Sequence, residues 1–209
     1  IILAVFAIFA AIMVGAVFHA HRDQELKRFA ASWKGRIHPG GFFEPPGVSF
    51  RLEDLPASID FTQHGDDPTQ THFTVPLTTV RLRLELRPQT SMRQLGKYLG
   101  MQDIEIGDPE FDAAFIIQGS NPRLIEEFLA PSVRAAIMRI AHCGAYGHFD
   151  LHLVLSGGNL RITKHQHLSS EAQLTKFAQA CRDLIRAIRQ ASQAGIEFVA
   201  APQARPMEE

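Results

Sequence analysis

The stretch HFDLHLVLSGGNLRITKHQH, residues 148–167, alternates apolar and polar side chains on either side of a Gly-Gly pair. Two adjacent glycines between alternating runs predict a β-hairpin with a two-residue turn. Counting back from this turn places Ser156 opposite Asn159 and His152 opposite Thr163. Because successive side chains of a strand point to opposite faces, one face of the hairpin is apolar and the other carries the histidines.

The polar face of this hairpin raises the question of a metal site. In the same register His148 lies opposite His167, and Asp150 lies opposite His165. Facing side chains about 5 Å apart can share a Zn²⁺ or Cu²⁺ ion, but a closed site needs three or four converging ligands, which a nearly flat hairpin seldom provides. We therefore expect a solvated or partner-covered sheet face, with metal binding by these four residues as the alternative. A pH-sensitive contact surface is a third interpretation, because neighbouring imidazoles resist joint protonation.

Alternating segments outside the hairpin extend the same pattern into a sheet. In TVRLRLELRP, residues 79–88, the apolar residues Val80, Leu82, Leu84 and Leu86 share one face, and charged residues occupy the other. This spacing predicts a strand of an antiparallel sheet with one face toward the core and one toward water.

Helix signals follow these strands. Asn121 precedes a proline and opens one helix, and Pro131 begins the next. The clearest helix begins at Ser170, where Gln173 completes a capping box, and it ends at Gly195. Together these elements predict an α+β fold, mainly an antiparallel sheet packed with helices.

The segment IILAVFAIFAAIMVGAVF, residues 1–18, contains no charged residue and no proline. As a helix it would be roughly 27 Å long, close to the thickness of the hydrocarbon core of a bilayer. We therefore expect a single transmembrane helix. Basic residues follow it, so the positive-inside bias places the domain on the cytoplasmic side of the inner membrane. Small residues at Ala7, Ala11 and Gly15 lie four apart and predict an interface with another membrane helix.

The composition shifts suggest four parts of the chain. Residues 1–36 form the transmembrane and juxtamembrane helix, in which Trp33 is the expected juxtamembrane contact. Residues 37–47 are a Pro/Gly linker, residues 48–199 are the soluble α+β domain, and residues 200–209 are a tail.

Charge and cysteine content exclude several classes of protein. The formal net charge is −1 and the isoelectric point is near 6.9, so the basic surface that nucleic-acid binding requires is not expected. Cys143 and Cys181 make no disulfide framework, and both a disulfide between them and a reducing compartment remain open. Since no nucleophile elbow, phosphate loop, zinc-protease or dinucleotide motif is present, we expect neither an enzyme nor a cofactor.

One segment has a distinctive spacing of glycine, proline, acidic and aromatic residues. Its positions are Gly107, Asp108, Pro109, Phe111, Asp112 and Phe115, followed by Leu129, Pro131, Val133 and Arg134. The segment resembles one in poorly characterised bacterial proteins in which a membrane helix precedes an α+β domain. The resemblance implies that architecture and no activity. A cation site at Asp108, Glu110 and Asp112 is not expected, because the longer ligand series and closing Glu of a calcium loop are missing.

These observations favour a non-enzymatic accessory or stabilising subunit of a larger membrane protein complex, of the respiratory or photosynthetic type. Its expected partners are other membrane protein subunits and the lipid bilayer, without nucleic acid. The alternatives are a metal-binding protein that uses the hairpin face of residues 148–167, and a membrane-tethered ligand sensor.

Overall fold

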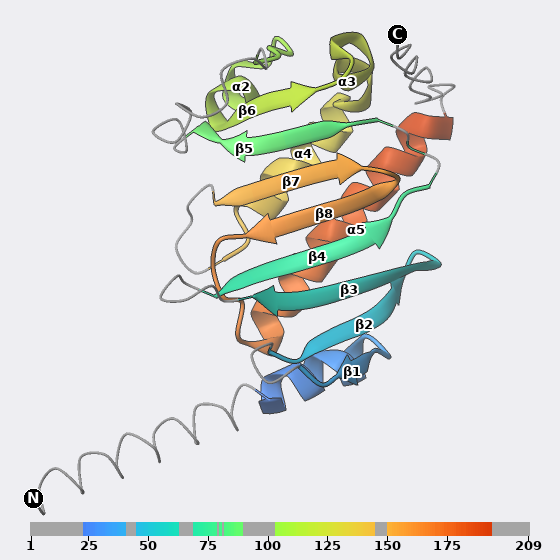
Figure 1. Ribbon diagram of the computed structural model, residues 1–209, viewed down its shortest axis with the longest axis vertical. Helices are drawn as coiled ribbons and strands as arrows, with labels where there is room; N and C mark the ends of the chain where they lie inside the picture. Colours follow the sequence, from blue (N-terminus) through green and yellow to red (C-terminus); the bar gives the residue numbers. More distant parts are fainter. Residues whose placement is uncertain are drawn as a thin grey trace, which may run out of the picture.

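The structure is a computed structural model that describes residues 23–40, 45–62, 69–78, 80, 82–89, 103–144 and 150–193. Its centre is one antiparallel sheet in the order β1-β2-β3-β4-β8-β7-β5-β6 (Figure 1). The strands are β1 (Arg36–His38), β2 (Gly47–Leu52), β3 (Leu55–Thr62), β4 (Gln70–Pro76), β5 (Leu84–Pro88), β6 (Phe115–Gly119), β7 (Leu151–Ser156) and β8 (Asn159–Lys164). The expected α+β class with a mainly antiparallel sheet is confirmed.

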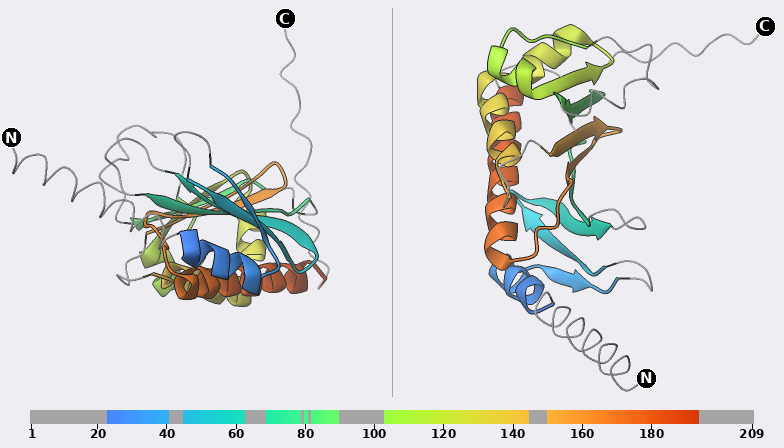
Figure 2. Two further views of the ribbon diagram at one scale, coloured as in Figure 1. Left: turned by 90° about the horizontal axis from the view of Figure 1, so that it is seen from below. Right: turned by 90° about the vertical axis from the view of Figure 1, so that its left-hand side faces the viewer.

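The helices gather on one face of this sheet. They are α2 (Pro109–Ala114), α3 (Pro122–Phe128), α4 (Pro131–Ala141) and α5 (Glu171–Gln193), together with a helical segment at residues 23–32. Figure 2 shows α4, α5 and the helical segment on the same side of the strands, and no described helix lies on the other side. One face of the sheet is therefore the core face, and we call the opposite one the open face.

Strict alternation places the apolar side chains on the core face. In β7 Leu151, Leu153 and Leu155 are at most 1% exposed, whereas His152 and Val154 between them are only partly buried. Each fully buried leucine contributes roughly 1.5–3 kcal/mol relative to an exposed one. This pattern fixes the register, because a slip of one residue would exchange the two faces of the strand.

The hairpin and the helix starts follow the expected local chemistry. Ser156 pairs with Asn159 and His152 with Thr163, as the turn predicts. Asn121 caps α3, and Pro131 is the first residue of α4. The backbone N–H of Gln173 donates to the Ser170 hydroxyl, and the Gln173 amide oxygen accepts from the backbone N–H of Ser170, which completes the capping box of α5. The expected end of this helix at Gly195 lies outside the described residues.

The strand predicted at residues 79–88 is shorter than its pattern suggests. β5 begins at Leu84, although Val80 and Leu82 are also buried. The reason is a turn before it, in which the backbone N–H of Val80 donates to the Leu77 carbonyl at 2.9 Å. The buried residues before β5 therefore belong to the core although they are not part of the strand.

The proposed domain boundaries also need correction. Leu26 and Phe29 in the helical segment are buried in the core, so the domain includes residues well before position 48. Trp33, the expected juxtamembrane contact, packs on the rings of Phe29 and Phe50, with the Arg182 guanidinium 5.4 Å from its ring centroid. The apolar stripe of this helix faces the sheet and α5, which explains its place in the domain.

The segment expected to be a linker contributes to the sheet. Its first residues form most of β1, and Gly47 begins β2, so that Ile37 pairs with Val48 and His38 with Gly47.

The expected classification as a single-pass membrane accessory subunit is corrected. Across the part of the chain that the structure describes, no helix is both long and apolar enough to cross a membrane. Residues 1–18, on which that expectation rested, and the stripe of Ala7, Ala11 and Gly15 lie outside the described residues. The tail at residues 200–209 lies outside them as well.

Both cysteines are free thiols in this structure. Cys143 is 3% exposed, and Cys181 on α5 is fully buried. Burial raises the pKa of both thiols, which makes them poor nucleophiles near neutral pH. Their role is packing.

Candidate functional site

The open face of the sheet carries a polar hollow over its central strands. Its volume is about 500 Å³. It is lined by side chains of β3, β4, β7 and β8 and the residue after β8: Thr62, Gln70, His72, His152, Val154, Ser156, Asn159, Arg161, Thr163 and His165. These residues alternate with the core leucines and phenylalanines, so the same two-residue period that builds the core also builds this surface.

A chain of hydrogen bonds across three strands forms the floor of the hollow. The His72 Nε2 lies 2.6 Å from the Thr62 hydroxyl, and its Nδ1 lies 2.9 Å from the Thr163 hydroxyl. His72 is 5% exposed and Thr163 is 6% exposed. The imidazole is therefore held at both nitrogens, which fixes the orientation of its ring.

A second polar group stands at the β7–β5 side of the hollow. The His152 Nε2 lies 2.8 Å from the Glu85 carboxylate, and the Arg87 guanidinium contacts the same carboxylate. Burial alone raises the pKa of Glu85, but the hydrogen bonds and charges of His152 and Arg87 outweigh it, so this pKa lies below its ordinary value. Glu85 is therefore ionised at neutral pH, and its carboxylate is already paired with His152 and Arg87.

The His165 ring stacks on the His152 ring, with their centroids 6.4 Å apart and their planes 10° apart. Loss of solvent lowers the pKa of His165, and neighbouring His152 and Lys164 lower it further against the opposing effect of Asp150. The His165 imidazole is consequently neutral at neutral pH and can donate or accept a hydrogen bond.

Arg161 is the exposed cation of the hollow. Its cross-strand neighbours are Val154 on β7 and Thr74 on β4, and both are uncharged. Among the described residues that line the hollow, Arg161 is the one with a permanent formal charge, and none is a carboxylate. The described part of the lining thus combines one arginine with histidine, hydroxyl and amide groups and Val154.

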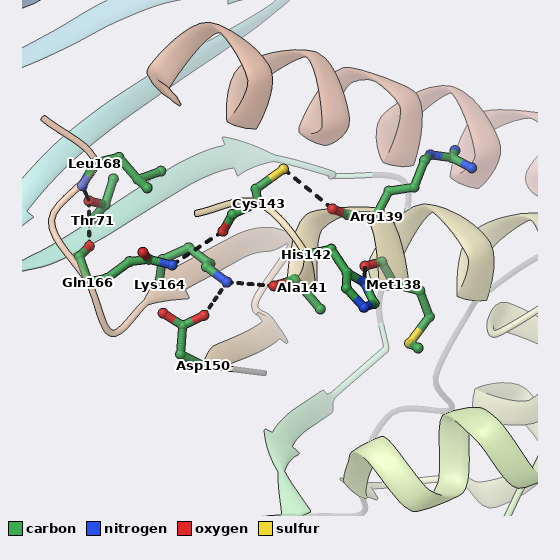
Figure 3. Close-up of polar contacts among 10 residues, drawn as sticks. All are labelled: Thr71, Met138, Arg139, Ala141, His142, Cys143, Asp150, Lys164, Gln166 and Leu168. Carbon is green, nitrogen blue, oxygen red and sulfur yellow. Dashed lines mark hydrogen bonds and ion pairs between the residues drawn. The ribbon is translucent and has the colours of Figure 1, made fainter. Parts of the chain in front are cut away.

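Behind the hollow, on the core face, β8 ends in a buried lysine (Figure 3). Lys164 is 0% exposed, and its ammonium group contacts the Asp150 carboxylate and donates to the Ala141 carbonyl at 2.9 Å. Ala141 is the last residue of α4, where carbonyls have no partner within the helix. The lysine therefore ties the end of α4 to the base of the hairpin that forms part of the hollow.

Three of the four proposed metal ligands lie within the described residues, and each of the three has another neighbour. Asp150 pairs with Lys164, the His167 ring packs edge-on against Phe61 at 5.2 Å, and His165 stacks on His152. His148 lies outside the described residues. Within those residues no group of three or more His, Cys, Asp or Glu side chains is placed to hold a metal ion.

Two important residues were missed by sequence reasoning. Lys164 shares the two-residue period of Leu160 and Ile162, so its place on the core face could have been found by extending that count. His72 belongs to the alternating run THFTVP, but its pairing with Thr163 depends on the contact of β4 with β8. No local pattern indicates that contact, because the two strands are far apart in the sequence.

The Gly-Asp-Pro segment is structural. The Asp108 side chain caps α2 by accepting from the Phe111 N–H, and it also pairs with Arg134 at 2.8 Å. The Asp112 carboxylate accepts backbone N–H groups of Ile106 and Asp108. These carboxylates are therefore committed to backbone and arginine partners, which accounts for the spacing of the segment.

Comparison with known proteins shows a likeness in fold to a solved structure. No protein-family model and no curated protein matches the chain. A solved structure, the crystal structure of the mycobacterial trehalose monomycolate transport factor A, TtfA, is similar in fold with a TM-score of 0.54. The two chains share 10% sequence identity, and the match covers 79% of this chain and 95% of that chain. At this identity the likeness is one of fold.

Proposed function

We propose that this chain is a non-enzymatic component of a larger protein assembly, and that the open face of its sheet recognises the partner. The observation that carries this proposal is the one-sided arrangement of the fold. The described helices gather on the core face, while polar side chains of β3, β4, β8, β7 and β5 occupy the other. A broad face that is polar, partly buried and pre-organised by its own hydrogen bonds suits recognition.

The organisation of the polar groups supports binding rather than simple solvation. Buried His72 and Thr163 are held in a fixed geometry at the floor of the hollow, and Glu85 is held by two partners at its side. Groups already fixed in the free protein lose little conformational freedom when a partner binds. The fold likeness adds a modest argument, since the solved structure is named as a transport factor.

The experiment measures the native size of the assembly. The full chain is expressed with an affinity tag in its native host and purified under native conditions. The molecular mass of the purified particle is compared with that of the chain alone, and proteins that copurify with it are identified by mass spectrometry. In the test variant, Ser58→Lys and Thr74→Lys, which lie opposite each other on β3 and β4, place two long cations in the centre of the open face. We expect the unmodified chain to run in a complex of fixed stoichiometry and this variant to run alone.

A control variant carries the same charges on the helix side. Ala172→Lys and Gln179→Lys replace exposed residues of α5 and should leave the complex intact. Circular dichroism and thermal melting establish that both variants fold. An unmodified chain that runs alone, or an open-face variant that stays in the complex, would overturn the proposed function.

A further inference from the structure

The hollow on the open face has the dimensions of a small-molecule site. Its volume of about 500 Å³ lies within the range of about 300–1,000 Å³ that is typical of ligand pockets. It is also built into the sheet, because its floor contains polar side chains that are more than nine-tenths buried, His72 and Thr163. Buried polar groups are normally satisfied by fixed partners, so this floor holds its geometry without a ligand.

The charge of the lining selects an anion. Arg161 projects from the middle of β8, with Val154 and Thr74 as cross-strand neighbours. Among the described residues, two carboxylates lie beside the hollow, and both have partners. Glu85 contacts Arg87 and His152. Asp60 on β3 accepts from the Ser58 hydroxyl and lies 3.6 Å from the His38 ring. A guanidinium group offers two parallel N–H donors to a carboxylate or phosphate, and that pairing is stronger than a neutral hydrogen bond.

The floor of the hollow selects hydroxyl groups. A neutral imidazole has one N–H and one bare nitrogen. Of the two hydroxyls bonded to His72, one therefore receives its N–H and keeps a hydrogen to donate, while the other donates to the bare nitrogen and keeps lone pairs to accept. In either neutral tautomer, Thr62 and Thr163 between them retain a donor and an acceptor. The His72 ring lies between the two threonines, so each remaining role is available to a different hydroxyl group of a ligand.

The spacing of these groups sets the size of the ligand. Arg161 and Thr163 are alternate residues of one strand, so their backbones lie roughly 7 Å apart on the same face. A ligand that spans this backbone spacing, with an oxyanion at Arg161 and a hydroxyl at Thr163, is about the size of one sugar ring. We propose that the hollow binds a small hydroxylated oxyanion of the sugar phosphate class. This inference goes beyond the proposed function, because it assigns a small-molecule ligand to the hollow on the same face.

The test uses glucose 6-phosphate, glucose and inorganic phosphate as probes in calorimetric titrations of the full chain. We expect saturable binding of glucose 6-phosphate, with weaker binding of inorganic phosphate and of glucose. Arg161→Gln should weaken the binding of glucose 6-phosphate by about tenfold or more, since it removes the charged donor. Thr74→Glu should also weaken it, because the new carboxylate faces Arg161 across the β4–β8 pair.

Two further variants separate the parts of the inference. Arg139→Gln removes an exposed arginine from α4 on the helix side and should bind glucose 6-phosphate as the unmodified chain does. Thr62→Val should remove the preference for glucose 6-phosphate over inorganic phosphate, because it takes a hydroxyl from the floor. Circular dichroism establishes that each variant is folded.

Several results would overturn the inference: no binding of glucose 6-phosphate at millimolar concentrations, equal affinity for glucose 6-phosphate and inorganic phosphate, or binding that survives Arg161→Gln. The failure of this inference is distinguishable from failure of the proposed function. Native size is measured without added ligand, so the complex can depend on the open face even if no sugar phosphate binds. Conversely, sugar phosphate binding by a chain that runs alone would leave only the ligand inference standing.

Discussion

Replacement of Lys164 by methionine should destabilise the protein strongly, although no surface property changes. The lysine ammonium is fully buried and contacts both the Asp150 carboxylate and the Ala141 carbonyl (Figure 3). Methionine keeps the length and the apolar stem of the side chain but removes the charge and all three donors. Two acceptors are then left without their partner inside the domain.

The magnitude follows from what is left behind. Breaking a buried ion pair by removing one partner typically lowers the free energy of unfolding by about 3–5 kcal/mol. Leaving a buried carbonyl without its hydrogen-bond donor lowers it by about 1–3 kcal/mol. The Asp150 side chain is 18% exposed, so water can reach part of it and the total falls short of the sum. We expect Lys164→Met to lower the free energy of unfolding by about 3–5 kcal/mol, a large share of the 5–15 kcal/mol of an ordinary domain.

The assay is urea unfolding followed by circular dichroism, on four proteins: unmodified, Lys164→Met, Asp150→Asn and the double variant. The double variant buries no unpaired charge, so its loss of stability should be smaller than the sum of the two single losses by about 2 kcal/mol. The matched control is Lys176→Met on the exposed side of α5, which should change stability by less than about 0.5 kcal/mol. A loss below about 1 kcal/mol for Lys164→Met, or additive single losses, would refute the reasoning.

Three further outcomes are expected. The lowered pKa of His165 means that the unfolded chain binds more protons, so stability should fall as pH drops below about 6.5; urea titrations at several pH values should show this dependence weaken in His165→Gln. Asp108→Ala removes the cap of α2 and an arginine partner and should lower the melting temperature, whereas Glu110→Ala on the exposed side of α2 should not, and equal melting temperatures would contradict the role of the cap. Gly119→Ala should reduce stability by about 1–3 kcal/mol in urea unfolding, because a methyl group at this position collides with the Arg83 carbonyl; an unchanged midpoint would show that the strand can shift.

The local elements of this fold could be predicted because their signals are local. The register of the hairpin follows from the two glycines of its turn, and the starts of α3, α4 and α5 follow from Asn121, Pro131 and the Ser170 capping box. Each of these signals acts through hydrogen bonds or dihedral limits within a few residues. The arrangement of the strands into one sheet does not follow from such local signals.

The order of the strands could not be predicted, and the site depends on it. β4 pairs with β8 across a long stretch of sequence, and that pairing brings His72 beside Thr163. The hairpin register alone placed the histidines of residues 148–167 on one polar face, with a shared metal site as the alternative to a solvated surface. In the structure His152 instead turns to Glu85 on β5, and His167 packs on Phe61 of β3. Contacts between strands decide which polar groups meet, and their energies depend on the partner rather than on the residue.

The two sides of β8 explain why the candidate site and the most sensitive position of the core lie so close together. Arg161 and Thr163 face the open side, and Lys164, one residue further, faces the core. A strand that carries its binding groups on one face must place its next residue among the helices, and here that residue is charged and paired. Because the Lys164 ammonium also holds the end of α4, a loss of the Asp150 pair would loosen the hairpin edge of the hollow. We therefore expect a folded Lys164→Met protein to bind glucose 6-phosphate more weakly in the calorimetric titration that tests Arg161→Gln. This effect is expected although Lys164 does not line the hollow. Unchanged affinity in a folded Lys164→Met protein would mean that the geometry of the open face is set by sheet pairing alone.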